Sequence, residues 1–186
     1  MQKKNNLKIT DIVIPAVSAV FIVVCSWVSI PLPFAVPFTL QTFAIFLITA
    51  LFGAKKATIS IAVYILLGLV GLPVFSGFNS GAGTFLGPTG GFMIGFFLIP
   101  VSYFVFTKVF SCSALFEIIG LIVGLILCYL TGTVWFLTVY AGAKGNTDIL
   151  KALSICVIPF IIPDLIKLFL AFVISKRLKP VIAKYN

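Results

Sequence analysis

The stretch "IIGLIVGLILCYLTGTVWFLTVYAGA", residues 118–143, has 26 residues and no charged side chain. A helix needs about 20 mostly apolar residues to cross the hydrocarbon core of a bilayer. Two more uncharged runs cover 19 residues at 12–30 and 51 residues at 57–107. The longer of these two must fold back on itself, because it exceeds one crossing. The runs predict a helical protein embedded in a membrane.

The composition of the chain agrees with this prediction. Of 186 residues, 61% are hydrophobic and 9% are charged, whereas a globular domain has about 25% charged residues. The net charge of +9 could suggest a nucleic-acid partner, but its Lys and Arg residues lie between apolar segments and not on one solvated face. We therefore predict an all-α integral membrane protein that contacts the lipid bilayer and binds no nucleic acid.

Residues typical of catalysis or metal binding are sparse. The chain has no His, its four Cys residues show no C-x-x-C spacing, and its four acidic residues are widely separated. Scattered Cys residues in apolar stretches are more often buried small hydrophobes than ligands. The glycine-rich stretch at 77–91 fits no nucleotide-binding loop, since no lysine follows its glycines. We predict no catalytic site, no metal and no cofactor.

Glycine and proline divide the apolar sequence into six predicted transmembrane helices that form one compact bundle and one domain, residues 1–186. Prolines at 31, 33 and 37 end the first helix, and Gly53 ends the second. A loop at 73–89 follows the third helix, in a region with seven glycines and two prolines between Gly71 and Gly91. The predicted helices span residues 12–30, 40–52, 57–72, 90–108, 115–140 and 150–177.

The positions of Lys and Arg predict the orientation of the bundle. With six helices, ten of the thirteen basic residues lie on one side, at the two termini and at the turns near residues 53–56 and 108–117. Cytoplasmic loops are enriched in Lys and Arg. We therefore predict a multi-pass protein of the plasma membrane with both termini in the cytoplasm, and an outer face that includes the glycine-rich and proline-rich loop.

Asp164 and Lys167 lie inside the last predicted helix, where an ionisable side chain costs about 2.5 to 3.5 kcal/mol on insertion scales. Their spacing of three places them on one helical face. Pro159 and Pro163 leave nearby carbonyls without their helical donors, as in the broken helices of transporters. The pair therefore indicates a polar substrate pocket, with a structural ion pair between helices as the alternative. A Schiff-base role for Lys167 is less consistent with the sequence.

Three further polar residues near the predicted outer face are candidate ligand contacts. Asn79, in the glycine-rich loop, either contacts a ligand or only serves a turn. Gln41 opens the second predicted helix, where interfacial solvation or capping is the simpler role. Tyr140 lies near the outer end of the fifth helix, where aromatic residues commonly form an interfacial belt.

Four motifs together resemble the BioY family, the biotin-specific substrate-binding (S) components of energy-coupling-factor (ECF) vitamin transporters. They are "VPFTLQT" at 36–42, "GLPVFSG" at 71–77, "GPTGGFMIGF" at 87–96 and "IPFIIPDLIKLFLA" at 158–171. The resemblance covers essentially the whole chain. It implies high-affinity capture and uptake of biotin, and partnership with a transmembrane coupling subunit and two cytoplasmic ATPase subunits.

The resemblance also assigns roles to individual residues. It places biotin on Asp164, Lys167 and Asn79, whose side chains can accept or donate hydrogen bonds to the ureido ring. Related components often dock on the coupling subunit through an A-x-x-x-A face of the first helix. Here the corresponding small residues are Pro15, Ala16 and Ala19, so docking through them is a hypothesis.

Other functions remain compatible with the same residues. One is an S component of this fold that selects another vitamin. A second is a self-sufficient, proton-coupled carrier of small solutes that uses Asp164 as its relay. A third is a structural assembly protein that binds no vitamin.

Overall fold

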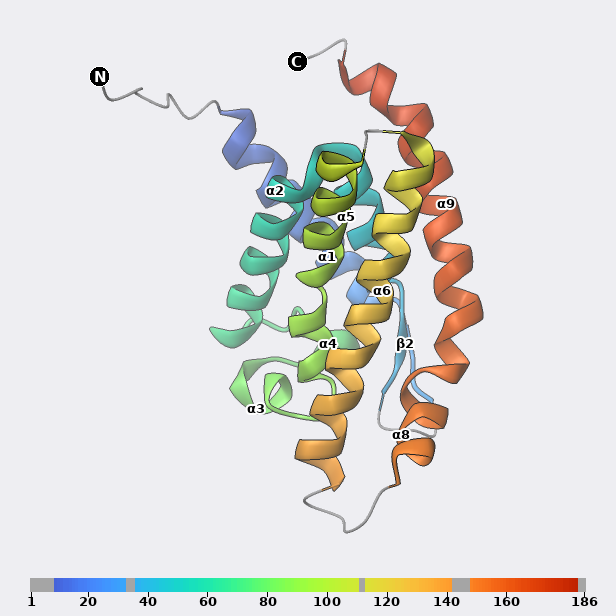
Figure 1. The fold of residues 1–186 in the computed structure, drawn as a ribbon. Coiled ribbons are helices and arrows are strands. Elements are labelled where there is room, and N and C mark those ends of the chain that lie inside the picture. The colour runs from blue at the N-terminus through green and yellow to red at the C-terminus, as the bar shows by residue number, and fades with distance from the viewer. Residues whose placement is uncertain (1–8, 33–35, 111–112, 142–147, 184–186) are drawn as a thin grey trace, which may run out of the picture.

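The computed structural model describes residues 9–32, 36–110, 113–141 and 148–183 and places them in a bundle of helices (Figure 1). A short antiparallel hairpin pairs Ser29 with Thr39 and Ile30 with Phe38. The elements are α1 (Thr10–Trp27), β1 (Ser29–Ile30), β2 (Phe38–Thr39), α2 (Gln41–Leu69), the 3-10 turn η1 (Ser76–Phe78), α3 (Gly81–Phe85), α4 (Gly90–Gly95), α5 (Leu98–Val109), α6 (Ala114–Phe136), the π-helical η2 (Leu137–Ala141), α8 (Ile149–Cys156) and α9 (Ile158–Ala183).

Five helical stretches of the described chain are long and apolar enough to cross a membrane. One of them, α2, is broken at Gly53, whose φ of 80° and ψ of 169° are not helical. The Gln41 Nε2 to Tyr64 OH distance is 2.6 Å, although 23 residues of straight helix would span about 35 Å. The chain therefore reverses at Gly53, and the two arms of α2 are the second and third of the six predicted helices.

Other helix boundaries differ from the prediction for local reasons. The first helix ends at Trp27 and not at Ile30, because residues 29 and 30 form β1. The sixth consists of α8 and α9. They are separated at Val157, which has a non-helical φ of −125° and lies two residues before Pro159. The fourth consists of α4 and α5. The predicted loop at 73–89 contains η1 and α3, and so has short helical turns.

Glycines allow α6 to approach α4 and α5 at backbone distance. A Cβ built on Gly124 would lie 2.6 Å from Ile99 Cα, and one on Gly120 would lie 2.9 Å from Tyr103 Cα. On α4, a Cβ on Gly91 would lie 2.2 Å from Trp135 Cβ. Small residues at a spacing of four are typical of close helix packing in membranes. This glycine seam positions α6 against the elements that line the site described below.

One end of the bundle, here called the basic end, gathers charged residues from several helices. Lys56 of α2 pairs with Asp11 of α1 at 3.6 Å. The buried Glu117 of α6 pairs with Lys176 and Lys179 of α9 at 3.3 and 3.1 Å. The start of α1, the break in α2 and the end of α9 share this end (Figure 1), as the charge pattern predicts. Lys3, Lys4, Lys8 and Lys184 lie outside the described residues.

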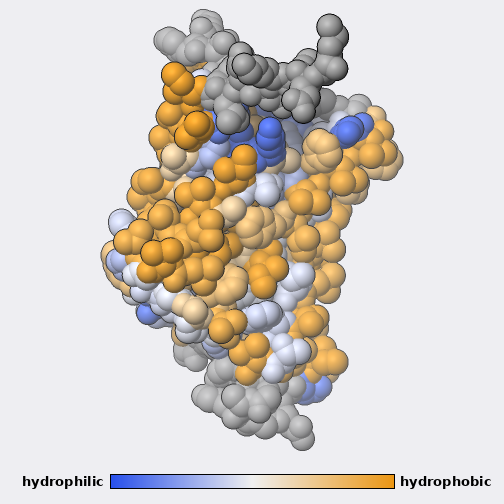
Figure 2. All heavy atoms as spheres, turned by 90° about the vertical axis from the view of Figure 1, so that its left-hand side faces the viewer, coloured by the Kyte–Doolittle hydropathy of each residue, from blue (hydrophilic) through white to orange (hydrophobic). Residues whose placement is uncertain are grey.

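The face of the molecule in Figure 2 is largely hydrophobic between its two ends, and other faces also expose apolar side chains. The exposed apolar side chains come from several helices and include Val17, Val20, Leu66, Phe104 and Ile126. Because water would oppose so much exposed apolar surface, a lipid environment accounts for it. The chain is therefore a membrane protein.

Candidate functional site

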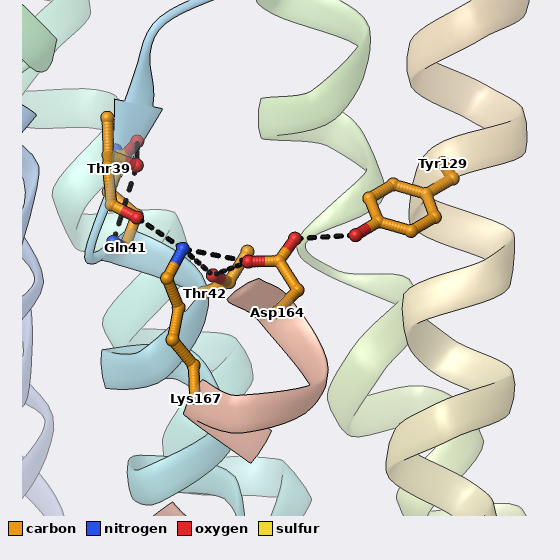
Figure 3. A network of polar contacts seen from close by, with 6 residues as sticks. All are labelled: Thr39, Gln41, Thr42, Tyr129, Asp164 and Lys167. Carbon is orange, nitrogen blue, oxygen red and sulfur yellow. Dashed lines mark hydrogen bonds and ion pairs between the residues drawn. The ribbon is translucent and has the colours of Figure 1, made fainter. Parts of the chain in front are cut away.

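Asp164 and Lys167 form an ion pair in the interior of the bundle. They lie one turn apart on α9, and Lys167 Nζ is 2.8 Å from Asp164 Oδ1 (Figure 3). Both residues are buried, with exposed fractions of 3% and 6%. The two charges thus neutralise each other where a single charge would be costly.

Three residues from other elements complete the partners of the pair. Thr42 Oγ1 donates to Asp164 Oδ1 at 2.8 Å. The Tyr129 hydroxyl of α6 donates to Asp164 Oδ2 at 2.6 Å. Lys167 Nζ donates to the carbonyl of Thr39 at 2.6 Å, and more weakly to Thr42 Oγ1 at 3.3 Å. The carboxylate therefore accepts three hydrogen bonds, and each proton of the ammonium group has an acceptor.

The hairpin next to α2 also contributes an aromatic ring. Lys167 Nζ lies 3.9 Å from the centroid of Phe38, a cation–π contact. Phe38 and Thr39 form β2, and Thr42 lies in the first turn of α2. The motif "VPFTLQT" therefore supports Lys167 with a backbone carbonyl, a hydroxyl and a ring. Sequence reasoning missed Thr42, Tyr129 and Phe38, because partners more than 30 residues apart leave no spacing signal.

A cavity, here called the inner cavity, opens beside the pair. One side is polar, with Thr39, Gln41, Thr42, Tyr129, Asp164 and Lys167. The rest is largely apolar and comes from the segment before α2, from η1, from α4 and the residues that flank it, and from α6, α8 and α9. These lining residues are Val36, Pro37, Ser76, Thr89, Phe92, Met93, Phe96, Cys128, Cys156 and Phe160. Apolar walls with a few convergent polar groups are typical of small-molecule sites.

A second cavity, here called the vestibule, adjoins the first. The two share Pro37, Ser76 and Thr89 in their linings. The vestibule lies between β1 and the segment from η1 to α4, and its other lining residues are Ser29, Pro31, Gly77, Asn79, Thr84 and Pro88. Among the described residues, its polar lining groups are hydroxyls and one amide, all of them neutral. It is the more exposed compartment, since Pro31, Gly77 and Asn79 are exposed.

The predicted ligand residues occupy different compartments. Asp164, Lys167 and Gln41 line the inner cavity. Asn79 lines the vestibule, and its Nδ2 donates to the carbonyl of Ser76 at 2.8 Å. Tyr140 lies in η2, and its side chain is outside the described residues. The structure thus brings together two of the three principal candidates and places the third in the adjoining compartment.

Gln41 continues the polar network away from the cavity. Its Oε1 accepts from Thr39 Oγ1 at 3.0 Å, and its Nε2 donates to the Tyr64 hydroxyl at 2.6 Å. Tyr64 is fully buried and does not line either cavity. Gln41 therefore holds β2, which supports Lys167, against the second arm of α2.

Tyr64→Phe is expected to lower the free energy of unfolding by about 1 to 3 kcal/mol, because the buried Gln41 amide loses its acceptor. The edge-to-face contact with Phe75, whose ring centroid is 5.6 Å away, stays in place. Unfolding in detergent measures the change. The double variant Gln41→Met/Tyr64→Phe removes both partners and should regain part of the loss. Additive losses would show that the two groups are not coupled.

The site suits binding of a polar but neutral ligand more than catalysis. It presents a carboxylate that accepts and an ammonium that donates, side by side, with no net charge. Within the described residues, no group of three or more His, Cys, Asp and Glu side chains could hold a metal ion. The pair ties α9 to α2 and α6 and also lines a cavity, and its role in a substrate pocket stays a prediction.

Comparisons with known proteins agree on one family. A model described as the BioY family matches residues 1–184. The biotin transporter BioY of Thermotoga maritima is 42% identical over 158 residues, covering 85% of this chain and 89% of that protein. The biotin transporter BioY of Lactococcus lactis subsp. cremoris is 34% identical over 182 residues, covering 94% of this chain and 93% of that protein.

A solved structure shows the same fold. The crystal structure at 2.1 Å of the S-component for biotin from an ECF-type ABC transporter matches with a TM-score of 0.80 and 33% sequence identity. The match covers 95% of this chain and 94% of that chain.

Proposed function

The chain belongs to the BioY family, and on this premise we propose that it captures biotin as the S component of an ECF-type ABC transporter. BioY is a family of transporters, so the chain is a transport component and not an enzyme. The observation that carries the proposal is the buried Asp164–Lys167 pair in the wall of the inner cavity. The ligand is biotin itself, and no cofactor is needed.

The ureido ring of biotin complements the pair. Asp164 accepts from a ureido N–H, and Lys167 donates to the ureido carbonyl in place of its weakest contact, the 3.3 Å bond to Thr42. The thiolane ring packs on the apolar wall, which includes Phe92, Met93 and Phe160. Asn79 meets the ligand from the vestibule, and Tyr140, whose side chain lies outside the described residues, stays a candidate contact.

The partners and the location follow from the same premise. A transmembrane coupling subunit and two cytoplasmic ATPase subunits drive uptake, and the chain lies in the cell membrane. The basic end faces the cytoplasm, in accord with the enrichment of Lys and Arg there, so both termini are cytoplasmic.

Calorimetry with biotin tests the binding function on the purified chain in detergent. Saturable binding of biotin, and not of other vitamins, is expected. Absence of biotin binding, or tighter binding of another vitamin, would contradict the proposal. Uptake by liposomes that hold this chain alone, driven by a pH gradient, would instead identify a self-sufficient carrier.

Docking on the coupling subunit involves the lipid-facing side of α1. Pro15 and Ala19 are buried in the bundle, which speaks against them as docking residues, whereas Ala16 is exposed beside Val13 and Val20. Ala16 is therefore the small residue of this helix that a partner helix could approach closely.

Ala16→Trp is expected to reduce co-purification of the chain with its coupling subunit at least severalfold, because the indole prevents close approach. Biotin binding by the isolated chain should stay unchanged, since Ala16 lies outside both cavities. Ile126→Trp on the exposed face of α6 is the matched control. Equal co-purification of both variants would place the docking surface elsewhere.

A further inference from the structure

We propose that the site also takes biotin derivatives whose carboxyl group is blocked, namely biotin amides up to biotinyl-lysine, with nearly the affinity of biotin. The inference rests on the proposed function and adds a substrate class to it. It follows from the way charge is distributed over the two adjoining cavities.

The inner cavity disfavours a carboxylate. Lys167 is the one cation among the described residues that line it, and its Nζ is already 2.8 Å from the carboxylate of Asp164. A ligand carboxylate on Lys167 would therefore place two anions around one buried cation, and like charges at close range repel strongly in a low dielectric. A ureido group avoids this conflict, because it is neutral and both donates and accepts.

The other end of the ligand then points toward the vestibule. The two cavities share Pro37, Ser76 and Thr89, so a ligand held by its ring at Asp164 can extend its valerate tail past these residues. The vestibule offers neutral groups, the hydroxyls of Ser29, Ser76, Thr84 and Thr89 and the amide of Asn79. Its described lining contains no Lys or Arg.

The neutral lining of the vestibule does not favour a charged carboxylate over a neutral group of similar shape. Neutral hydroxyl and amide donors bond a carboxylate oxygen or an amide oxygen alike. The vestibule is also bordered by exposed residues, so a substituent on the carboxyl group can extend outward. Replacing the acid by an amide should therefore cost little affinity, whereas a change to the ureido group should cost much.

A ligand series on the purified, full-length chain tests the inference by calorimetry. Biotinamide and biotinyl-lysine are expected to bind within about fivefold of biotin. Protonated 2-iminobiotin should bind at least about thirtyfold more weakly, because it presents a cation to Lys167 where the ureido carbonyl would accept. A hundredfold weaker binding of biotinamide would overturn the inference while leaving biotin capture intact. Failure of biotin itself to bind would contradict the proposed function.

A charge placed in the vestibule tests where the ligand carboxylate lies. Ser29→Asp, with Ser29→Asn as the matched control, changes a residue that lines the vestibule but not the inner cavity. The Asp variant should bind biotin about tenfold more weakly than the control, because the two carboxylates repel each other. The affinity for biotinamide should differ less than twofold between the same two variants. If both ligands respond alike, the carboxylate does not occupy the vestibule and the inference fails.

Discussion

Lys167→Met is expected to be the most damaging single substitution at the site. It leaves the buried Asp164 carboxylate without its cation and the Thr39 carbonyl without its donor. Breaking a buried pair by removing one partner costs about 3 to 5 kcal/mol of the free energy of unfolding. Biotin affinity should fall by about 10-fold to 100-fold, because one charge-assisted hydrogen bond is lost. Unfolding in detergent and calorimetry measure the two effects.

Two comparison variants separate the effect of Lys167→Met on stability from its effect on biotin binding. In Asp164→Asn/Lys167→Met neither residue of the pair is charged, so most of the stability should return while biotin binding stays weak. Lys176→Met on the same helix removes a lysine whose side chain is 40% exposed and whose partner Glu117 keeps Lys179. It should change stability by about 1 kcal/mol or less. If the double variant bound biotin like the parent, the pair would be purely structural.

Gly124→Ala is expected to destabilise the bundle by about 1 to 3 kcal/mol through overpacking. The new methyl group would lie 2.6 Å from Ile99 Cα, and a backbone atom cannot turn away as a flexible side chain can. Helix α6 must then move away from α5. Because α6 also carries Tyr129, which holds Asp164, biotin binding should weaken as well. Thermal unfolding in detergent and calorimetry measure these changes.

Gly83→Ala provides the matched control for this substitution. Gly83 lies in α3, is exposed, and has no heavy atom within 4 Å of a built Cβ. The same added methyl group should leave stability and binding close to those of the parent. Equal effects of the two substitutions would mean that the glycine seam does not determine how closely the helices pack.

Much of the architecture could be predicted because each signal is local. Long uncharged runs predict spans, and Gly53 and the prolines predict where they end. The structure confirms a helical bundle in which the predicted second and third helices are the arms of α2. The joints within helices were not predictable in the same way. The interruption between α4 and α5 lies at Phe96 and Phe97, inside an uncharged apolar run whose hydropathy gives no sign of a break.

By itself, the sequence determined that the chain lies in a membrane, which end carries the positive charge, and that Asp164 and Lys167 share a helical face inside it. Hydropathy, charge counts and helical periodicity suffice for these, since they depend on residue type and short spacing. The tertiary structure decided which groups satisfy the pair, bringing Thr42 and Tyr129 to Asp164 across 122 and 35 residues. It also separated Asn79 from the pair by placing it in the vestibule. A buried charge needs partners, but only the fold brings particular distant residues within hydrogen-bonding distance.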